Sequence, residues 1–188
     1  MVSDDGEFPR LLAKAQAGDN AAMRSLFLEL HPRLVRFLRA NEPRVCDDLA
    51  GEVWMAVARG LKEFEGDGSA FRAWIFSIAR RRIADHRRTG VRRRTDPVEH
   101  SRLEDRAAID DSEATAMAHL TGQEAAELIV ATLPPDQAEV ILLRVLADLE
   151  VEVVAEIMGR SANWVRVTQH RALQRLTDRL GSRIDVIR

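Results

Sequence analysis

The sequence predicts an all-α protein built from two small helical domains joined by an acidic, flexible linker. Apolar residues recur at helical spacing along most of the chain, and no run shows the alternation typical of a strand. Charge is segregated into a basic block at 71–94, an acidic block at 96–127 and a second basic block from 160 onward. Because the acidic block is poor in large apolar residues, we expect domains at 1–94 and 121–188 and a linker at 95–120.

Residues that cap or break helices divide the first domain into four expected helices. The first begins near Phe8, and the third runs from about Asp47 to Phe64. Gly18 is expected to end the first helix, and Asp19 or Asn20 to cap the second. Pro32 is expected to interrupt or kink the second helix. The loop 66–69 is expected to precede the fourth helix, with Ser69 as its cap.

The fourth helix is predicted to have one face for packing and one for negative charge. Its apolar stripe is Phe71, Trp74, Ile75 and Ile78, at i, i+3, i+4 and i+7. The spacing favours Trp74 as a core residue over a base-stacking one. Arg80 and Arg87 are expected opposite the stripe, with Arg81 and Arg88 on one flank and Asp85 paired with Arg81 or Arg88. The concentration of arginine favours phosphate contact over solubility alone.

The second domain contains a helix-turn-helix pattern. A capping box at 121–124 opens one helix, and Pro134-Pro135 ends it and starts the next. A short helix at 151–158, a turn at 159–161 and a last helix from 162 to about 180 follow. In the last helix the expected buried residues are Val165, Ala172, Leu173, Leu176 and Leu180, and the expected outward residues are Asn163, Val167, His170, Arg171 and Gln174. These outward side chains suit base edges in a major groove.

Composition argues against several other classes of protein. The formal net charge is −2, but the segregation of charge indicates two polyanion-binding surfaces. Cys46 is the only cysteine, which fits a reducing cytoplasm, and no apolar run is long enough to span a membrane. The five histidines lack metal-ligand spacing, and no phosphate loop or nucleophile motif occurs. We therefore expect no catalytic residue, metal or cofactor, and no enzyme.

Two sets of motifs resemble the extracytoplasmic-function sigma factors. Four segments resemble region two of that family: DDL at 47–49, EVW at 52–54, FRAWIFSIAR at 71–80 and DHRR at 85–88. Three further segments resemble region four: LPPDQAEV at 133–140, VAEIMG at 154–159 and HRAL at 170–173. Their order and joint presence make the match specific, and together they cover most of the chain outside the linker.

The resemblance implies partners and residue roles. Core RNA polymerase would bind Asp47, Asp48, Leu49, Glu52, Val53 and Met55. The minus-ten promoter element would contact Gly66, Asp67, Gly68, Ser69, Arg72, Arg80, Arg81, Arg87 and Arg88. The minus-thirty-five element would contact Arg160, Ser161, Asn163, Trp164, Arg166, Val167, His170 and Arg171. An anti-sigma factor is implied as a further partner.

Two alternatives to a sigma factor remain at this point. A stand-alone helix-turn-helix regulator would explain the second domain, but it leaves the motifs of the first domain without a role. A scaffold or adaptor protein would explain the helices, but not two separate arginine-rich surfaces. The sequence therefore predicts a cytoplasmic sigma factor that directs promoter-specific transcription initiation.

Overall fold

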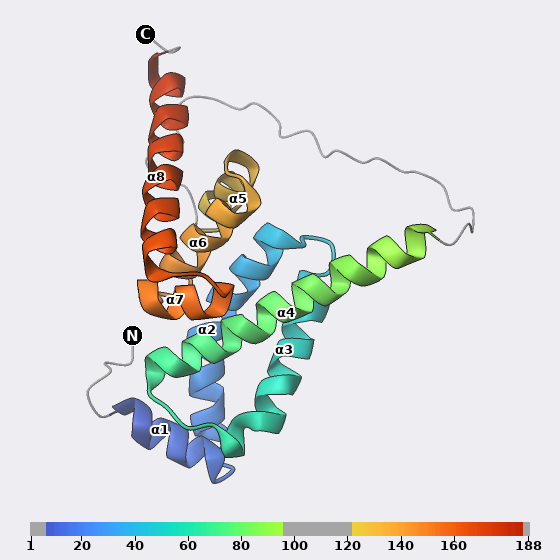
Figure 1. The fold of residues 1–188 in the computed structure, drawn as a ribbon. Coiled ribbons are helices and arrows are strands. Elements are labelled where there is room, and N and C mark those ends of the chain that lie inside the picture. The colour runs from blue at the N-terminus through green and yellow to red at the C-terminus, as the bar shows by residue number, and fades with distance from the viewer. Residues whose placement is uncertain (1–6, 96–121, 186–188) are drawn as a thin grey trace.

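The protein is all-helical over the residues that the computed structural model describes, 7–95 and 122–185, which confirms the predicted fold class. The predicted linker begins at Thr95, which is the last residue of α4, and the rest of it and the predicted cap at Thr121 lie outside the described residues. The elements are α1 (Glu7–Gln16), α2 (Asn20–Asn41), α3 (Cys46–Gly60), the 3-10 helix η1 (Leu61–Glu63), α4 (Gly68–Thr95), α5 (Gly122–Thr132), α6 (Pro135–Val145), α7 (Val151–Met158) and α8 (Ala162–Asp185). Figure 1 shows their arrangement.

Helices α1 to α4 pack around an aromatic and aliphatic core. Phe37 of α2 meets Phe76 of α4 edge to face, with ring centroids 5.3 Å apart. Phe71 and Ile75 of α4 are fully buried and Ile78 is buried, as the helical stripe predicts. Trp74 is partly buried against this core and stacks on Phe64, which supports its assignment as a packing residue.

The helix boundaries correct two expectations in this domain. Asp19 caps α2 by accepting hydrogen bonds from the Ala21 and Ala22 amides, as predicted, but α2 continues through Pro32 without interruption. The buried residues Leu30 and Leu34 flank this proline, so packing maintains the helix across the lost hydrogen bond. Asp67, not Ser69, caps α4, because its carboxylate accepts from the Ala70 amide at 2.7 Å.

Helices α5 to α8 form the second domain. Pro134 and Pro135 separate α5 from α6, and α7 matches the predicted bounds 151–158. Gly159, with φ +63°, ends α7 in the left-handed conformation that glycine accommodates readily.

The predicted buried stripe of α8 is partly wrong. Val165 and Ala172 are fully buried, but Leu173 is 48% exposed and Thr168 is buried instead. The contact face of α8 follows residues 165, 168, 172 and 176, with 176 half-buried, and position 173 lies about 100° away from position 172. Leu180 lies outside the residues whose side chains are described.

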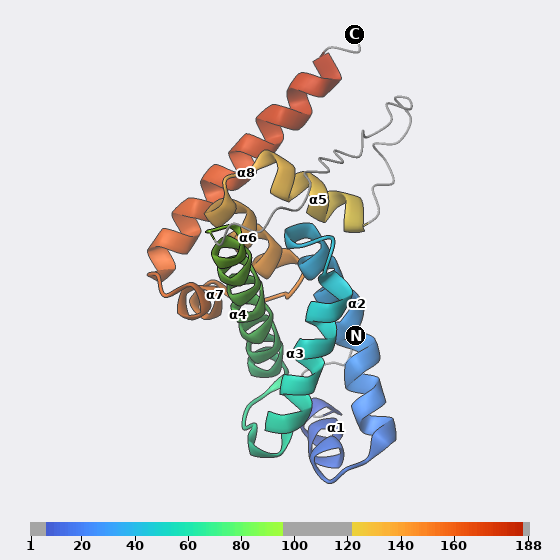
Figure 2. The same ribbon diagram turned by 90° about the vertical axis from the view of Figure 1, so that its right-hand side faces the viewer.

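The two domains pack directly against one another. Helix α5 contacts α2, and α7 contacts α4 (Figures 1 and 2). One continuous cluster of buried apolar residues runs from α1 through α4 into α5, α6, α7 and α8. The first helix of the helix-turn-helix therefore lies against the arginine-rich helix of the first domain.

No helix within 7–95 and 122–185 is both long and apolar enough to cross a membrane.

Candidate nucleic-acid interface

The outer face of α3 is acidic and has one large exposed apolar side chain. Asp47, Asp48 and Glu52 are exposed, and Met55 is 60% exposed. Arg82 of α4 lies 3.5 Å from the Glu52 carboxylate, and Arg39 of α2 lies 4.0 Å from Asp47.

The α3 residues predicted to bind a partner divide into two groups. Asp47, Asp48, Glu52 and Met55 are available on the surface, whereas Leu49 and Val53 are buried and hold α3 in place. Hydrogen bonding with Cys46, together with the charge of Asp47, raises the pKa of Arg39 above its ordinary value. Arg39 thus remains a cation beside this otherwise acidic face.

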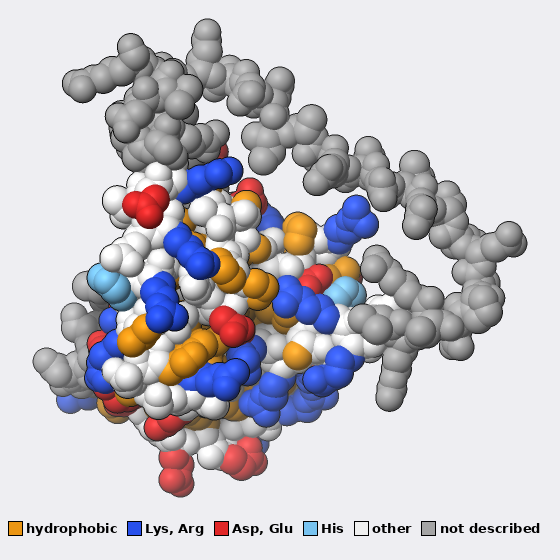
Figure 3. Space-filling view, turned by 45° about the horizontal axis from the view of Figure 1, so that its top comes forward, with side chains coloured by type: hydrophobic (Ala, Val, Ile, Leu, Met, Phe, Trp, Pro, Cys, Tyr) orange, Lys and Arg blue, Asp and Glu red, His pale blue; other side chains and the backbone are white. Residues whose placement is uncertain are grey.

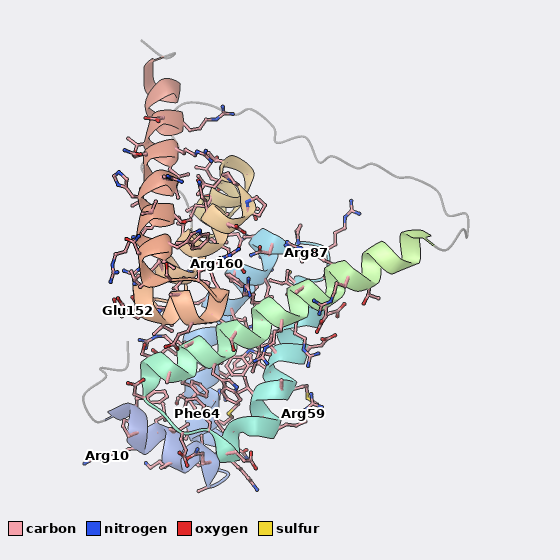
Figure 4. The ribbon with its side chains drawn as sticks, viewed as in Figure 1. Arg10, Arg59, Phe64, Arg87, Glu152 and Arg160 are labelled. Carbon is pink, nitrogen blue, oxygen red and sulfur yellow. The ribbon has the colours of Figure 1, made fainter. Side chains whose placement is uncertain are left out.

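The loop between η1 and α4 is fixed where it begins. The Gln16 side chain of α1 donates to the Leu61 carbonyl at 3.0 Å and to the Phe64 carbonyl at 2.8 Å. Phe64 stacks on Trp74 with centroids 5.1 Å apart, and Figure 4 shows Phe64 close to the start of α4. Gln16 was not among the predicted site residues, because it lies 48 positions before Phe64 and no local pattern links the two.

Within this loop the four predicted residues differ in accessibility. Gly66 and Asp67 are exposed, Ser69 is half-buried and Gly68 is buried. Gly66 has φ +150°, and a Cβ there would lie 2.8 Å from the Ala70 Cβ and 3.1 Å from the Phe64 ring. The exposed part of the loop is therefore short and its backbone requires glycine.

Replacing Gly66 with alanine should lower the free energy of unfolding by about 1–2 kcal/mol, because the new Cβ forces the loop out of a conformation that L residues rarely adopt. Urea denaturation followed by circular dichroism measures the change. Gly51→Ala is the matched control, since that helical glycine has no neighbouring atom within 4 Å and alanine favours a helix. A Gly66→Ala protein as stable as Gly51→Ala would contradict the assignment.

Among the α4 side chains that the structure describes, those of four arginines make hydrogen bonds within the protein. Arg81 bonds to Ser77 on its own helix, and Arg88 pairs with Asp85, one of its two predicted partners. Arg87 reaches Glu42 and the Asn41 carbonyl at the end of α2, and it is labelled in Figure 4.

Arg80 alone among these four bonds to the second domain. Its Nε lies 2.8 Å from the Glu139 carboxylate of α6, and its Nη1 donates to the Ile157 carbonyl of α7 at 3.2 Å. Arg72 is half-buried, and its buried Nε has no hydrogen-bond partner. The predicted minus-ten residues therefore differ in how far they are free to meet DNA.

Helix α8 presents the outward face that its sequence predicts. Asn163, Val167, His170, Arg171 and Gln174 are all exposed. Basic side chains are spread over the face of the molecule in Figure 3, with apolar side chains between them.

The start of α8 is supported by its neighbours. The Ser161 hydroxyl accepts from the Trp164 amide at 3.1 Å, and the Arg160 guanidinium lies 5.4 Å from the centre of the Trp164 ring. Glu152 of α7 pairs with Arg166 across the turn. Glu152 and Arg160 lie where α7 meets α8 (Figure 4). A capped basic helix with an exposed polar face is suited to a major groove.

Two protein families match successive parts of the chain. Residues 26–94 match Sigma-70 region 2, and residues 123–176 match Sigma-70, region 4.

Curated relatives match over nearly their whole length. The ECF RNA polymerase sigma factor SigD of Mycobacterium tuberculosis is 33% identical over 186 residues, covering 96% of this chain and 87% of SigD. The ECF RNA polymerase sigma factor ShbA of Streptomyces griseus is 34% identical over 176 residues, covering 88% of this chain and 91% of ShbA.

Two solved structures share the fold. The sigma factor RpoE of Bartonella quintana, in complex with the anti-sigma factor NepR, aligns with a TM-score of 0.65 and 22% identity over 85% of this chain and 96% of that one. CnrH, in complex with the cytosolic domain of CnrY, aligns with a TM-score of 0.60 and 19% identity over 93% of this chain and 97% of that one.

Proposed function

Because the chain belongs to the extracytoplasmic-function RNA polymerase sigma factors of the sigma-70 family, we propose that three surfaces divide its work: α3 for polymerase, the 66–69 loop with α4 for the minus-ten element, and α8 for the minus-thirty-five element. A factor of this family directs RNA polymerase to specific promoters at initiation and is not an enzyme. The proposed domain bounds are 1–94 and 121–188, with 95–120 as the linker.

The acidic face of α3 carries the polymerase assignment. Asp48 and Glu52 are one helical turn apart, so both project on the same side of α3, and Met55 lies beside them. An exposed methionine beside carboxylates offers a basic partner both charge and adaptable apolar contact. Leu49 and Val53 contribute indirectly, by packing this face onto the core.

The loop and α4 suit an unpaired DNA strand. A base removed from the duplex needs a pocket with a fixed backbone, and Gln16 and the Phe64–Trp74 stack provide the fixed support. The strand backbone needs a row of cations, which Arg72, Arg81 and Arg88 supply along α4.

Helix α8 suits duplex DNA. Asn163 and Arg171 can read adenine and guanine edges, and Val167 can contact a thymine methyl group. Arg160, Arg166 and His170 border these readers and can meet phosphates. The exposure of this whole face supports its assignment to the minus-thirty-five element.

A partner that blocks these surfaces is also proposed. The structure of RpoE, which shares the fold of this chain, is a complex with the anti-sigma factor NepR. We propose that this chain has an anti-sigma partner as well, and that it acts in the cytoplasm, where polymerase and promoter DNA meet.

The test is binding to core RNA polymerase. The purified chain should co-elute with sigma-free core enzyme on gel filtration, and the Asp48→Ala/Glu52→Ala double variant should bind about tenfold more weakly, because two charged contacts are lost. Glu63→Ala, which removes an exposed carboxylate just beyond α3, is the control. Wild-type chain that fails to co-elute while folded would refute the proposed function and favour a stand-alone regulator.

A further inference from the structure

We propose that Glu152 of α7 is a positioning residue at the minus-thirty-five element, and that it directs Arg166 of α8 to a base edge instead of a phosphate. This role rests on the proposed binding of duplex DNA by α8 and deepens it. The partner of an arginine on a recognition helix decides which part of the DNA that arginine can meet, so Glu152 would determine sequence preference without reading a base itself.

An ion pair joins the two helices of the helix-turn-helix. The Glu152 Oε1 atom accepts from the Nη2 atom of Arg166, which lies 14 positions further along the chain. Glu152 lies in the first turn of α7, where that helix meets α8 (Figure 4). Arg166 lies between Asn163 and His170 on α8, one turn from each. The pair therefore borders the outward face that is proposed to enter the major groove.

The charges on α7 disfavour a phosphate contact at this border. The helix carries Glu152 and Glu156, both exposed, and it has no basic residue. A carboxylate repels a phosphate, and a guanidinium paired with a carboxylate attracts one less strongly, because the pair has no net charge. An unpaired arginine in the place of Arg166 would instead be drawn to the DNA backbone whatever the sequence.

The pair leaves Arg166 able to read a guanine. A guanidinium has five N–H donors in a fixed plane, and Glu152 accepts from only one of its nitrogens. Within the described part of the chain, Nε and Nη1 of Arg166 make no hydrogen bond. Guanine presents two neutral acceptors, O6 and N7, in the major groove, so hydrogen bonds to it do not depend on a net positive charge. Glu152 also restrains a side chain that is 57% exposed and otherwise free to rotate.

Removal of the Glu152 charge with its shape retained tests this role. Glu152→Gln leaves Arg166 with a full charge that a phosphate can meet. Glu150→Gln is the matched control, because it makes the same change of charge two positions earlier, at an exposed residue 3.5 Å from Arg144 of α6. Both variants should stay folded by circular dichroism, since exposed ion pairs contribute little to stability.

Fluorescence anisotropy of each full chain measures binding to two duplexes, one selected by the wild-type chain from a random library and one scrambled. Relative to Glu150→Gln, Glu152→Gln should bind the scrambled duplex about threefold more tightly, and its ratio of selected to scrambled affinity should fall about fivefold. The slope of log affinity against log salt concentration should steepen by about 0.9, because one more phosphate is neutralised. Simple structural support of α8 by Glu152 would instead weaken both duplexes without steepening that slope.

The Arg166→Ala background shows whether Glu152 acts through Arg166. Arg166→Ala alone should lower the affinity ratio by about fivefold or more, and Glu152→Gln should then lower it no further than Glu150→Gln does. Replacement of single guanines by 7-deazaguanine, which lacks the N7 acceptor, locates the base. One such replacement should weaken binding of the wild-type chain and have no effect on Arg166→Ala.

The role of Glu152 is overturned if Glu152→Gln and Glu150→Gln give equal affinity ratios and salt slopes, or if the effect of Glu152→Gln persists in the Arg166→Ala background. Failure of the proposed function gives a different result. A wild-type chain that selects no sequence from the library refutes the minus-thirty-five assignment of α8, and the role of Glu152 with it. A wild-type preference that Glu152→Gln leaves as Glu150→Gln does supports the assignment of α8 and refutes the role of Glu152 alone.

Discussion

Replacing Phe71 with alanine should lower the free energy of unfolding of the first domain by about 3–5 kcal/mol. Phe71 is fully buried, and its ring lies 5.7 Å from Phe8, 5.2 Å from Phe64 and 5.9 Å from Trp74 between ring centroids. The truncation therefore removes apolar contacts from α1, the loop and α4 together and leaves a cavity among them. Because domains are commonly stable by only 5–15 kcal/mol, roughly, the loss is a large share of the total.

Urea denaturation followed by circular dichroism measures the effect of Phe71→Ala. Leu28→Ala is the control, because Leu28 is in the same domain but 59% exposed, and it should change stability by about 0.5 kcal/mol or less. Equal effects of the two variants would show that Phe71 is not part of a packed core. A selective effect of Phe71→Ala would show that the aromatic cluster stabilises the packing of the loop between η1 and α4 on α4.

Features that depend on local spacing could be predicted from the sequence. The bounds of α7 were predicted correctly, since an apolar run followed by Gly159 specifies both a helix and its end. The packed stripe of α4 and the exposed face of α8 followed from periods of three and four residues. The family, too, was predicted from motif order and is confirmed by matches at 26–94 and 123–176.

Features that depend on distant residues could not be predicted in this way. Arg80 and Glu139 are 59 positions apart, so helical spacing placed Arg80 on an outer face without showing what would cover that face. The support of the loop by Gln16 is equally non-local. The uninterrupted course of α2 through Pro32 reflects packing by Leu30 and Leu34 that local propensity does not contain.

Two predictions, the cap of α4 and the buried face of α8, were wrong by a few positions along the chain, and the cause was local in each case. Asp67 and Ser69 are both good capping residues two positions apart, and only the position of the first helical turn decides between them. In α8, Leu173 was expected in the core because it is apolar, but the smaller Thr168 occupies the contact face instead. The prediction followed the apolar character of Leu173 rather than its position around the helix, and the position was the better guide.

Loss of the Arg171 side chain should weaken binding of a duplex that contains the cognate minus-thirty-five element by about 1–3 kcal/mol, roughly fivefold to 150-fold, if Arg171 reads a guanine edge. Arg171 is exposed on the outward face of α8, one turn beyond Val167. Arg175→Ala is the control, because Arg175 lies one turn farther along α8 and bonds back to Gln137 of α6 at 3.2 Å. Fluorescence anisotropy with cognate and scrambled duplexes gives both affinities.

The salt dependence of binding distinguishes base reading from phosphate contact at Arg171. Each phosphate contact contributes a slope of about −0.9 to the change of log affinity with log salt concentration, so a lost phosphate contact reduces the slope by about one. A base-reading Arg171 instead predicts an unchanged slope and a loss confined to the cognate duplex. An equal loss on both duplexes with a reduced slope would show that Arg171 binds the backbone. Sequence discrimination would then rest on Asn163 and Val167, the outward residues nearest the start of α8.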